Sequence, residues 1–136
     1  MKIIRVVAAI ICDDMNAPSR IFATARGYGE FKGQWEFPGG KIEEGEAPED
    51  ALHREIREEL DTEIEVGDLI CTIEYDYPTF HLSMDCFFAK VREGEPVLKE
   101  AEAARWLTQS ELYEVQWLPA DLSLIAMIEK KMTAVN

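Results

Sequence analysis

The sequence predicts one α/β domain over residues 1–136, an α/β/α sandwich with a mixed central sheet. Strand and helix patterns are interspersed along the chain without the regular βαβ rhythm of a doubly wound sheet. The 136 residues are 47% hydrophobic, which is enough for a single core and leaves no room for a second domain. No repeat, linker or low-complexity tract divides the sequence.

The first strands come from the N-terminal third of the chain. Residues 2–12 are rich in Val and Ile and predict a buried strand. Residues 16–19, with an Asn, a Pro and a Ser, predict a turn before a second strand over residues 20–26. Residues 27–33 contain three glycines, so we expect a loop there.

The middle of the chain predicts a helix followed by a hairpin. Pro48 suits the first turn of a helix that ends near Leu60. Residues 69–77 and 80–91 are β-rich, and the Pro-Thr pair at 78–79 between them predicts a hairpin or a tight bend.

The C-terminal part predicts a short strand and two helices. Residues 104–107 form the strand, and Thr108 with Glu111 fits a capping box for a short helix. The last helix is expected over residues 121–131, because apolar residues recur there on one side: Leu122, Ile125, Ile128 and Met132.

Charge and cysteine content limit the partners and the compartment. The net charge is -13, so the chain repels the phosphates of a nucleic acid polymer, whereas a nucleotide that brings its own Mg²⁺ is acceptable. Three widely separated cysteines, Cys12, Cys71 and Cys86, predict free thiols in a reducing cytoplasm. The apolar run at residues 6–12 barely reaches the lower limit for a signal peptide, and Asp13 and Asp14 follow it where a small-residue cleavage site would be expected, so we interpret it as a strand. No run approaches the length of a membrane span, about 18 residues.

The most informative pattern is the placement of three glutamates on the predicted helix. At about 100° per residue, Glu58 and Glu59 lie about 60° and 40° to either side of Glu55. Like charges at this spacing destabilise an isolated helix, and a bound divalent cation would reverse that effect. Carboxylate oxygens suit Mg²⁺ or Mn²⁺, which often take substrate phosphates as further ligands. A solvated, Glu-rich helix face is the alternative.

The residues around this helix resemble the signature of the Nudix hydrolases, G-x5-E-x7-R-E-U-x-E-E-x-G-U, where U is a bulky aliphatic residue. Two positions depart from it, because Asp61 replaces the glycine and Thr62 replaces the last aliphatic residue. Asp tolerates the left-handed backbone that glycine adopts at a helix C-terminus, so we expect no loss of catalysis. The matching residues are Gly40, Glu46, Arg54, Glu55, Ile56, Glu58 and Glu59.

The resemblance implies a mixed sheet between helical layers and metal-assisted hydrolysis of a phosphoanhydride. It adds the carbonyl of Gly39 to the metal ligands Glu55, Glu58 and Glu59, with Mg²⁺ as the cofactor and Mn²⁺ as a substitute. It also implies a further carboxylate before the strand that contains Trp106. Glu100 fits that position as ligand or general base, and Glu102 competes with it.

Arg54 and Glu46 are expected to support these ligands. Arg54 is four residues before Glu58 and can hold its carboxylate, as a catalytic residue or as a structural ion pair. Glu46 can orient the helix or assist the attacking water, and an acid near a helix N-terminus is also favoured by the dipole. The general base is left open among Glu55, Glu58 and Glu100.

The flanking sequence resembles the MutT-like nucleoside triphosphate pyrophosphohydrolases within this family. That resemblance implies that a base binds between Phe37, Tyr77 and Phe80 and is read by Asp121, although aromatic residues on strands are often core and an Asp before a helix is often an N-cap. An ionised Asp accepts hydrogen bonds only. Arg26 and Lys41 are candidates for phosphate contacts or ordinary surface charges.

The expected reaction converts a (deoxy)nucleoside triphosphate to the monophosphate and pyrophosphate. An 8-oxo-dGTP substrate and a CTP or modified dCTP substrate both remain open, and either implies clearance of the nucleotide pool and a part in DNA repair. The alternatives are hydrolysis of ADP-ribose or a dinucleotide polyphosphate, and nucleotide sensing without turnover. The sequence leaves a monomer and a homodimer equally open.

Overall fold

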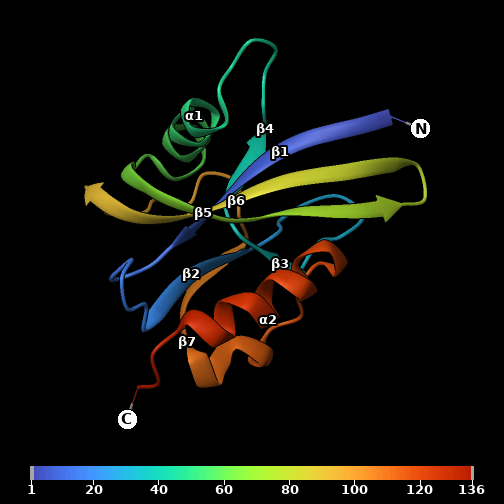
Figure 1. Ribbon diagram of the computed structural model, residues 1–136. Coiled ribbons are helices and arrows are strands. Elements are labelled where there is room, and N and C mark those ends of the chain that lie inside the picture. The colour runs from blue at the N-terminus through green and yellow to red at the C-terminus, as the bar shows by residue number, and fades with distance from the viewer. Residues whose placement is uncertain (1, 136) are drawn as a thin grey trace.

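The computed structural model describes residues 2–135. Within these residues four strands precede the first helix, three strands follow it, and the two longest strands form a hairpin (Figure 1). The strands are β1 (Lys2–Ile11), β2 (Arg20–Ala25), β3 (Trp35–Glu36), β4 (Gly39–Lys41), β5 (Glu63–Tyr77), β6 (Phe80–Glu93) and β7 (Ala103–Thr108). The helices are α1 (Pro48–Leu60) and α2 (Leu122–Lys131), with the 3₁₀ turns η1 (Gln109–Glu114) and η2 (Pro119–Asp121).

The strands form two sheets. The larger sheet has the order β4-β1-β6-β5 and is mixed, since β1 pairs with β6 in parallel while its other pairings are antiparallel. The smaller sheet, β3-β2-β7, is antiparallel. The predicted mixed sheet is confirmed, and the second sheet is a feature that the sequence patterns did not separate from it.

The larger sheet lies between two helical layers, with α1 on one face and α2 beyond the other (Figure 1). Strand β1 shows why, because its buried side chains alternate between the two faces as a strand requires. Val7, Ala9 and Ile11 pack with α1 in one core cluster. Ala8 and Ile10 pack with α2 and the smaller sheet in the other. The predicted α/β/α sandwich is therefore confirmed.

Helix α1 begins and ends as its sequence predicts. Pro48 occupies its first turn, where the missing N–H costs nothing. Leu52, Ile56 and Leu60 are fully buried on one side. Asp61 closes the helix in the left-handed conformation, with φ 50° and ψ 45°, and donates its N–H to Arg57 O at 3.0 Å. Asp61 therefore takes the role of the signature glycine, as expected.

The hairpin is longer than predicted. Strand β5 starts at Glu63 instead of residue 69, because irregularities in its pairing near Gly67 let it continue through a glycine that breaks the sequence pattern. The turn at residues 78–79 joins it to β6 as expected.

The C-terminal helices and the cysteines agree with most of the predictions. The short helix after Thr108 is a 3₁₀ turn, where the Glu111 carboxylate accepts the Thr108 N–H at 2.8 Å. The last helix starts at Leu122, one residue later than predicted. The three cysteines are free thiols, as expected. No helix within residues 2–135 is long and apolar enough to cross a membrane.

The glycine pair before α1 belongs to a strand. Gly39 and Gly40 are part of β4, which pairs with β1 opposite Ala8 and Val7. A side chain at Gly39 would overlap the Val7 carbonyl, so glycine is needed there for strand pairing. The backbone that approaches Gly39 closely is therefore that of β1.

Candidate active site

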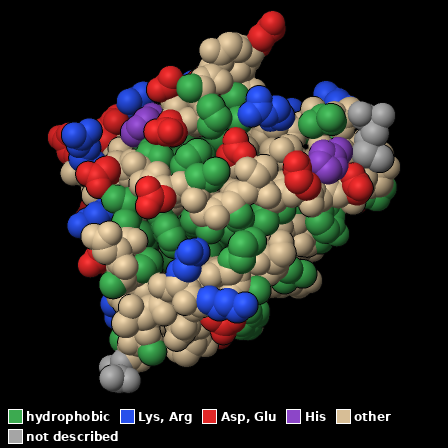
Figure 2. Space-filling view, viewed as in Figure 1, with side chains coloured by type: hydrophobic (Ala, Val, Ile, Leu, Met, Phe, Trp, Pro, Cys, Tyr) green, Lys and Arg blue, Asp and Glu red, His purple; other side chains and the backbone are tan. Residues whose placement is uncertain are grey.

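The glutamates of α1 point away from its apolar stripe, as their spacing predicts. Glu58 is exposed, whereas Glu55 and Glu59 are half-buried against β4. Acidic and basic side chains crowd the molecular surface over α1 in Figure 2. We call Glu55, Glu58 and Glu59 the carboxylate face.

The two inner carboxylates contact the glycines of β4. Glu59 accepts the Gly39 N–H at 3.2 Å. The Glu55 carboxylate fills the space that a side chain at Gly40 would need. Burial raises the pKa of Glu59 to about 8, and nearby carboxylates add to that effect. Burial also raises the pKa of Glu55. Glycine at position 40 therefore makes room for the Glu55 carboxylate.

Arg54 balances the charge beside this face. Its guanidinium donates two hydrogen bonds to Glu46, both at 2.9 Å, and one to Glu55 at 2.8 Å. It also donates to the Lys41 carbonyl at 3.0 Å. The predicted partner, Glu58, accepts the longest of these bonds at 3.4 Å. Arg54 is therefore held mainly by Glu46 and reaches the carboxylate face chiefly through Glu55.

Glu46 connects the loop before α1 to Arg54 on the helix. The Arg54 guanidinium lowers the pKa of Glu46 to about 2, so this acid stays ionised. Its carboxylate also accepts the Glu43 N–H at 3.0 Å within the loop before α1, and its bonds with Arg54 tie this loop to the helix. These contacts are compatible with the interpretation that Glu46 orients the helix, and the alternative, that it assists the attacking water, stays a prediction.

Glu100 faces the carboxylate face from another part of the chain. It lines a small cavity together with Glu36 and Glu59. Its competitor, Glu102, donates its backbone N–H to Ala25 O at 2.9 Å, as an extension of the β2–β7 pairing. The structure therefore brings Glu100 to the site.

The carboxylates fit a hard divalent cation by donor type, because they present oxygen atoms at a partly desolvated surface. As placed, no group of three or more acidic, His or Cys side chains among residues 2–135 is close enough to enclose a metal ion. Arg54 lies between Glu55 and Glu58 and separates them. These side chains need rotamer changes to share one cation.

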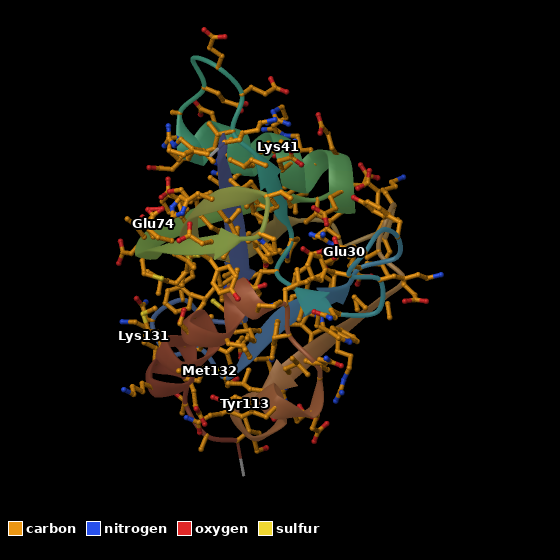
Figure 3. The ribbon with its side chains drawn as sticks, turned by 90° about the vertical axis from the view of Figure 1, so that its right-hand side faces the viewer. Glu30, Lys41, Glu74, Tyr113, Lys131 and Met132 are labelled. Atoms are coloured by element: carbon orange, nitrogen blue, oxygen red, sulfur yellow. The ribbon has the colours of Figure 1, made fainter. Side chains whose placement is uncertain are left out.

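A second, larger cavity lies on the other side of β4. Its volume is about 180 Å³, and we call it the base cavity. Five of the six predicted substrate residues line it, Lys41 being the exception. Lys41 lies at the end of β4 close to α1 with its side chain exposed, as Figure 3 shows. The lining includes Arg26, Phe31, Glu36, Phe37, Gly39, Gly40, Tyr77, Phe80, Leu82, Met84 and Asp121.

Aromatic rings form much of this cavity. Tyr77 stacks on Phe80 with ring centroids 5.0 Å apart, and Phe31 packs on Tyr77 at 5.7 Å. Phe37 stacks on Trp117, also at 5.0 Å, and is buried with it. Sequence reasoning missed Phe31, which lies in the glycine loop, and Trp117, which follows the 3₁₀ turn. Neither segment has a periodic pattern that would have identified them.

Arg26 is paired inside the cavity. Its guanidinium makes a bidentate ion pair with Glu36, at 3.1 and 2.7 Å. Both residues line the base cavity and the small cavity that contains Glu100. The charge of Arg26 is therefore balanced by Glu36. No sequence pattern indicated this pair.

Asp121 lies at the end of the cavity where α2 begins. It is 4% exposed and makes no side-chain cap to the helix, so the N-cap alternative is not supported. Burial raises the pKa of Asp121 to about 8, and the charge of Glu36 raises it further. At neutral pH this residue is mostly a neutral acid, which donates as well as accepts. This pKa favours a neutral, donating Asp121 over the ionised, acceptor-only residue expected from the sequence.

Comparison with known proteins agrees with this geometry. The family profile of the NUDIX domain matches residues 2–127. An 8-oxo-dGTP diphosphatase of Haemophilus influenzae is 39% identical, over 91% of this chain and 90% of the relative. A CTP pyrophosphohydrolase of Escherichia coli K12 is 32% identical, over 92% of this chain and 90% of the relative.

Solved structures give the same result. The solution structure of the E. coli ORF135 protein superimposes with a TM-score of 0.80 at 32% identity, covering 96% of this chain and 91% of that one. The solution structure of a MutT protein from methicillin-resistant Staphylococcus aureus 252 has a TM-score of 0.70 at 36% identity, covering 97% and 98%.

Proposed function

The chain belongs to the Nudix family, and from that premise we propose that it is a Mg²⁺-dependent hydrolase that converts a nucleoside triphosphate to the monophosphate and pyrophosphate. One observation carries the proposal. Gly39 and Gly40 line the base cavity, and the same two glycines contact Glu59 and Glu55. A nucleotide whose base fills the cavity would therefore direct its phosphates toward the carboxylate face.

The proposed ligands of Mg²⁺, or of Mn²⁺ in its place, are Glu55, Glu58, Glu59, Glu100 and the Gly39 carbonyl. When bound, the cation neutralises charge on the phosphate oxygens and lowers the pKa of a bound water. Crowding and burial of Glu55 and Glu59 support this assignment, because a cation would stabilise their charged forms.

The remaining side chains would position the reactants. Arg54, held by Glu46, keeps the Glu55 carboxylate oriented by a charge-assisted hydrogen bond. Glu55, Glu58 and Glu100 are the candidates for the base that accepts a proton from the attacking water. Lys41 and Arg26 are proposed phosphate contacts, and Arg26 would have to exchange Glu36 for phosphate.

The base cavity supports a guanine or cytosine nucleotide. Relatives named as 8-oxo-dGTP diphosphatases and as a CTP pyrophosphohydrolase both match the chain at 32% identity or more over most of its length. A neutral Asp121 can pair with an edge that offers one donor beside one acceptor, as the edges of both bases do. The stacked Tyr77 and Phe80 rings line the cavity, which supports their proposed role as contacts of the base plane.

The test is a panel of nucleotides, incubated with the protein and Mg²⁺, with all products resolved. We include 8-oxo-dGTP, dGTP, CTP, 5-substituted dCTP, ADP-ribose and a dinucleotide polyphosphate. Pyrophosphate and a monophosphate in equal amounts support the proposal. Two phosphorylated fragments without pyrophosphate, or binding without turnover, would replace it with one of the alternative functions.

We further propose that the protein acts in the cytoplasm on free nucleotides, as a monomer or homodimer. The charge of -13 supports a small nucleotide over a nucleic acid polymer. If damaged nucleotides are its substrate, hydrolysis would remove them before incorporation and so contribute to DNA repair. Loss of the gene would then raise the spontaneous mutation frequency, which can be counted under oxidative stress.

A further inference from the structure

The C-terminal end of α1 is attached to a segment that is distant in sequence. A helix leaves its last four carbonyl groups without partners inside the helix. Two of them are satisfied by residues 95–99, since Val97 donates its N–H to Leu60 O at 2.8 Å and Lys99 to Glu59 O at 3.2 Å. The segment therefore follows the turn of α1 that carries the carboxylate face.

Thr62 fastens the start of this segment. Its side chain is buried, with the residue 3% exposed, and its hydroxyl oxygen lies 2.8 Å from Leu60 O and 3.1 Å from Glu95 O. The single hydroxyl proton is therefore shared between these two carbonyl oxygens. Thr62 stands where the family signature has an aliphatic residue. Packing at this position needs only an apolar side chain. The Thr62 hydroxyl adds a link between the helix and the segment.

The other end of the segment is held by the smaller sheet. Glu102 donates its N–H to Ala25 O at 2.9 Å. Gly27 permits this approach, because a Cβ there would lie only 2.9 Å from the Glu100 carbonyl oxygen. Glu100 lies between these two anchors and lines the small cavity with Glu36 and Glu59.

We infer that Thr62 is a positioning residue for Glu100: its hydroxyl holds residues 95–99 on the end of α1 and so fixes the Glu100 carboxylate opposite Glu59. This inference rests on the proposed function, in which Glu100 binds the cation. An exposed glutamate on a free loop would lose conformational entropy on binding a cation. Because the two anchors already order the backbone around Glu100, most of this conformational entropy is lost on folding and not on cation binding.

The test is a double-mutant cycle that is read out by Mn²⁺ affinity without nucleotide, measured from the free-ion signal in electron paramagnetic resonance. Thr62→Val keeps the shape and removes the hydroxyl, and Thr62→Ser restores the hydroxyl. We expect Thr62→Val to weaken Mn²⁺ binding about five-fold, the effect of one lost hydrogen bond. Thr62→Ser should bind as the wild type does.

In a Glu100→Gln background, Thr62→Val should have no further effect, because the residue that it positions no longer binds the ion. Thr72→Val is the matched control, since its hydroxyl donates to Asp85 at 2.8 Å on the exposed hairpin. Gly27→Ala disturbs the other anchor and should repeat the same non-additive result if Thr62→Val does not fold.

The outcomes separate this inference from the proposed function. Equal losses of Mn²⁺ affinity in the wild-type and Glu100→Gln backgrounds, or a loss of stability alone, would overturn the role of Thr62. Mn²⁺ binding with the expected non-additivity but no nucleotide turnover would support Thr62 and reject the hydrolase. A wild type that binds no Mn²⁺ would reject the carboxylate assignment and the inference with it.

Discussion

The carboxylate face and the base cavity meet at Gly39 and Gly40, yet they differ in the interactions that dominate them: charges on the carboxylate face and apolar packing in the base cavity. The carboxylate face is crowded with like charges, and ion pairs with Arg54 offset part of their repulsion. The base cavity is mostly aromatic and aliphatic, and its acid, Asp121, is buried. The difference indicates that one side can bind a cation and phosphates while the other selects a base, so substitutions should separate turnover from affinity.

The largest effect is expected on the carboxylate face. Glu58→Gln removes one charge from the proposed cation site, and we expect kcat to fall about 10³-fold, since the cation stabilises the transition state by several kcal/mol. Glu58 is exposed, so the unfolding free energy should change little. Steady-state kinetics and urea unfolding measure the two quantities.

Glu49→Gln is the control for Glu58→Gln. Glu49 is exposed on the first turn of the same helix, and the variant makes the same change of charge. A kcat for Glu58→Gln that equals the kcat of this control would show that Glu58 is an ordinary surface residue.

Arg54→Lys, beside the carboxylate face, should lower kcat less than Glu58→Gln does. Lysine keeps the positive charge but cannot bond Glu46 in a bidentate manner while it reaches Glu55. We expect a ten- to hundred-fold loss of kcat, about the cost of removing a residue that orients a metal ligand. Arg57→Lys is the control, because Arg57 pairs with Glu63 away from the site. Equal kinetics for both variants would contradict the role of Arg54.

The sequence predicted the carboxylate face well because its residues are local. Glu55, Glu58 and Glu59 belong to one helix, and helix geometry alone places them together. Asp61 could be predicted as the helix C-cap for the same reason. The choice of Glu46 as the main partner of Arg54 could not, since it depends on how the loop before α1 folds back.

The base cavity was predictable only in part, because it is assembled from four distant segments. Phe37, Tyr77 and Phe80 were found through the family resemblance, whereas Phe31 is an isolated aromatic residue in a loop. The protonation of Asp121 depends on burial by the whole fold, which no sequence pattern reports. Local chemistry was therefore easier to predict than the environment of a residue.

Phe31→Ala tests whether the base cavity determines the affinity for the nucleotide. Phe31 lines the cavity and packs on Tyr77, so its loss should raise KM about ten-fold through weaker stacking on the base. The kcat should stay within about two-fold, because uniform binding does not change the chemical step. Tyr28→Ala, in the same loop and exposed, is the control. A fall in kcat with unchanged KM would contradict the separation of the two sides.

Asp121→Asn should have the smallest effect at neutral pH and a distinctive dependence on pH. The pKa of an Asp carboxyl is 3.8 in the unfolded chain, and burial raises the pKa of Asp121 to about 8 in the fold. Between these values the folded state keeps a proton that the unfolded state has lost. The unfolding free energy of the wild type should therefore fall, relative to Asp121→Asn, as pH rises from about 4 to about 8, by at most about 1.4 kcal/mol per pH unit.

Urea unfolding of the metal-free proteins at several pH values measures this difference. Above pH 8 Asp121 is ionised in both states, so the difference between the proteins should become constant. The buried Glu59 titrates in the wild type and in the variant alike, so its contribution cancels. Asp68→Asn, at an exposed position of β5, supplies the control. A difference between wild type and Asp121→Asn that does not vary from pH 4 to 8 would mean that Asp121 is ionised in the fold, and an acceptor-only residue would then read the base.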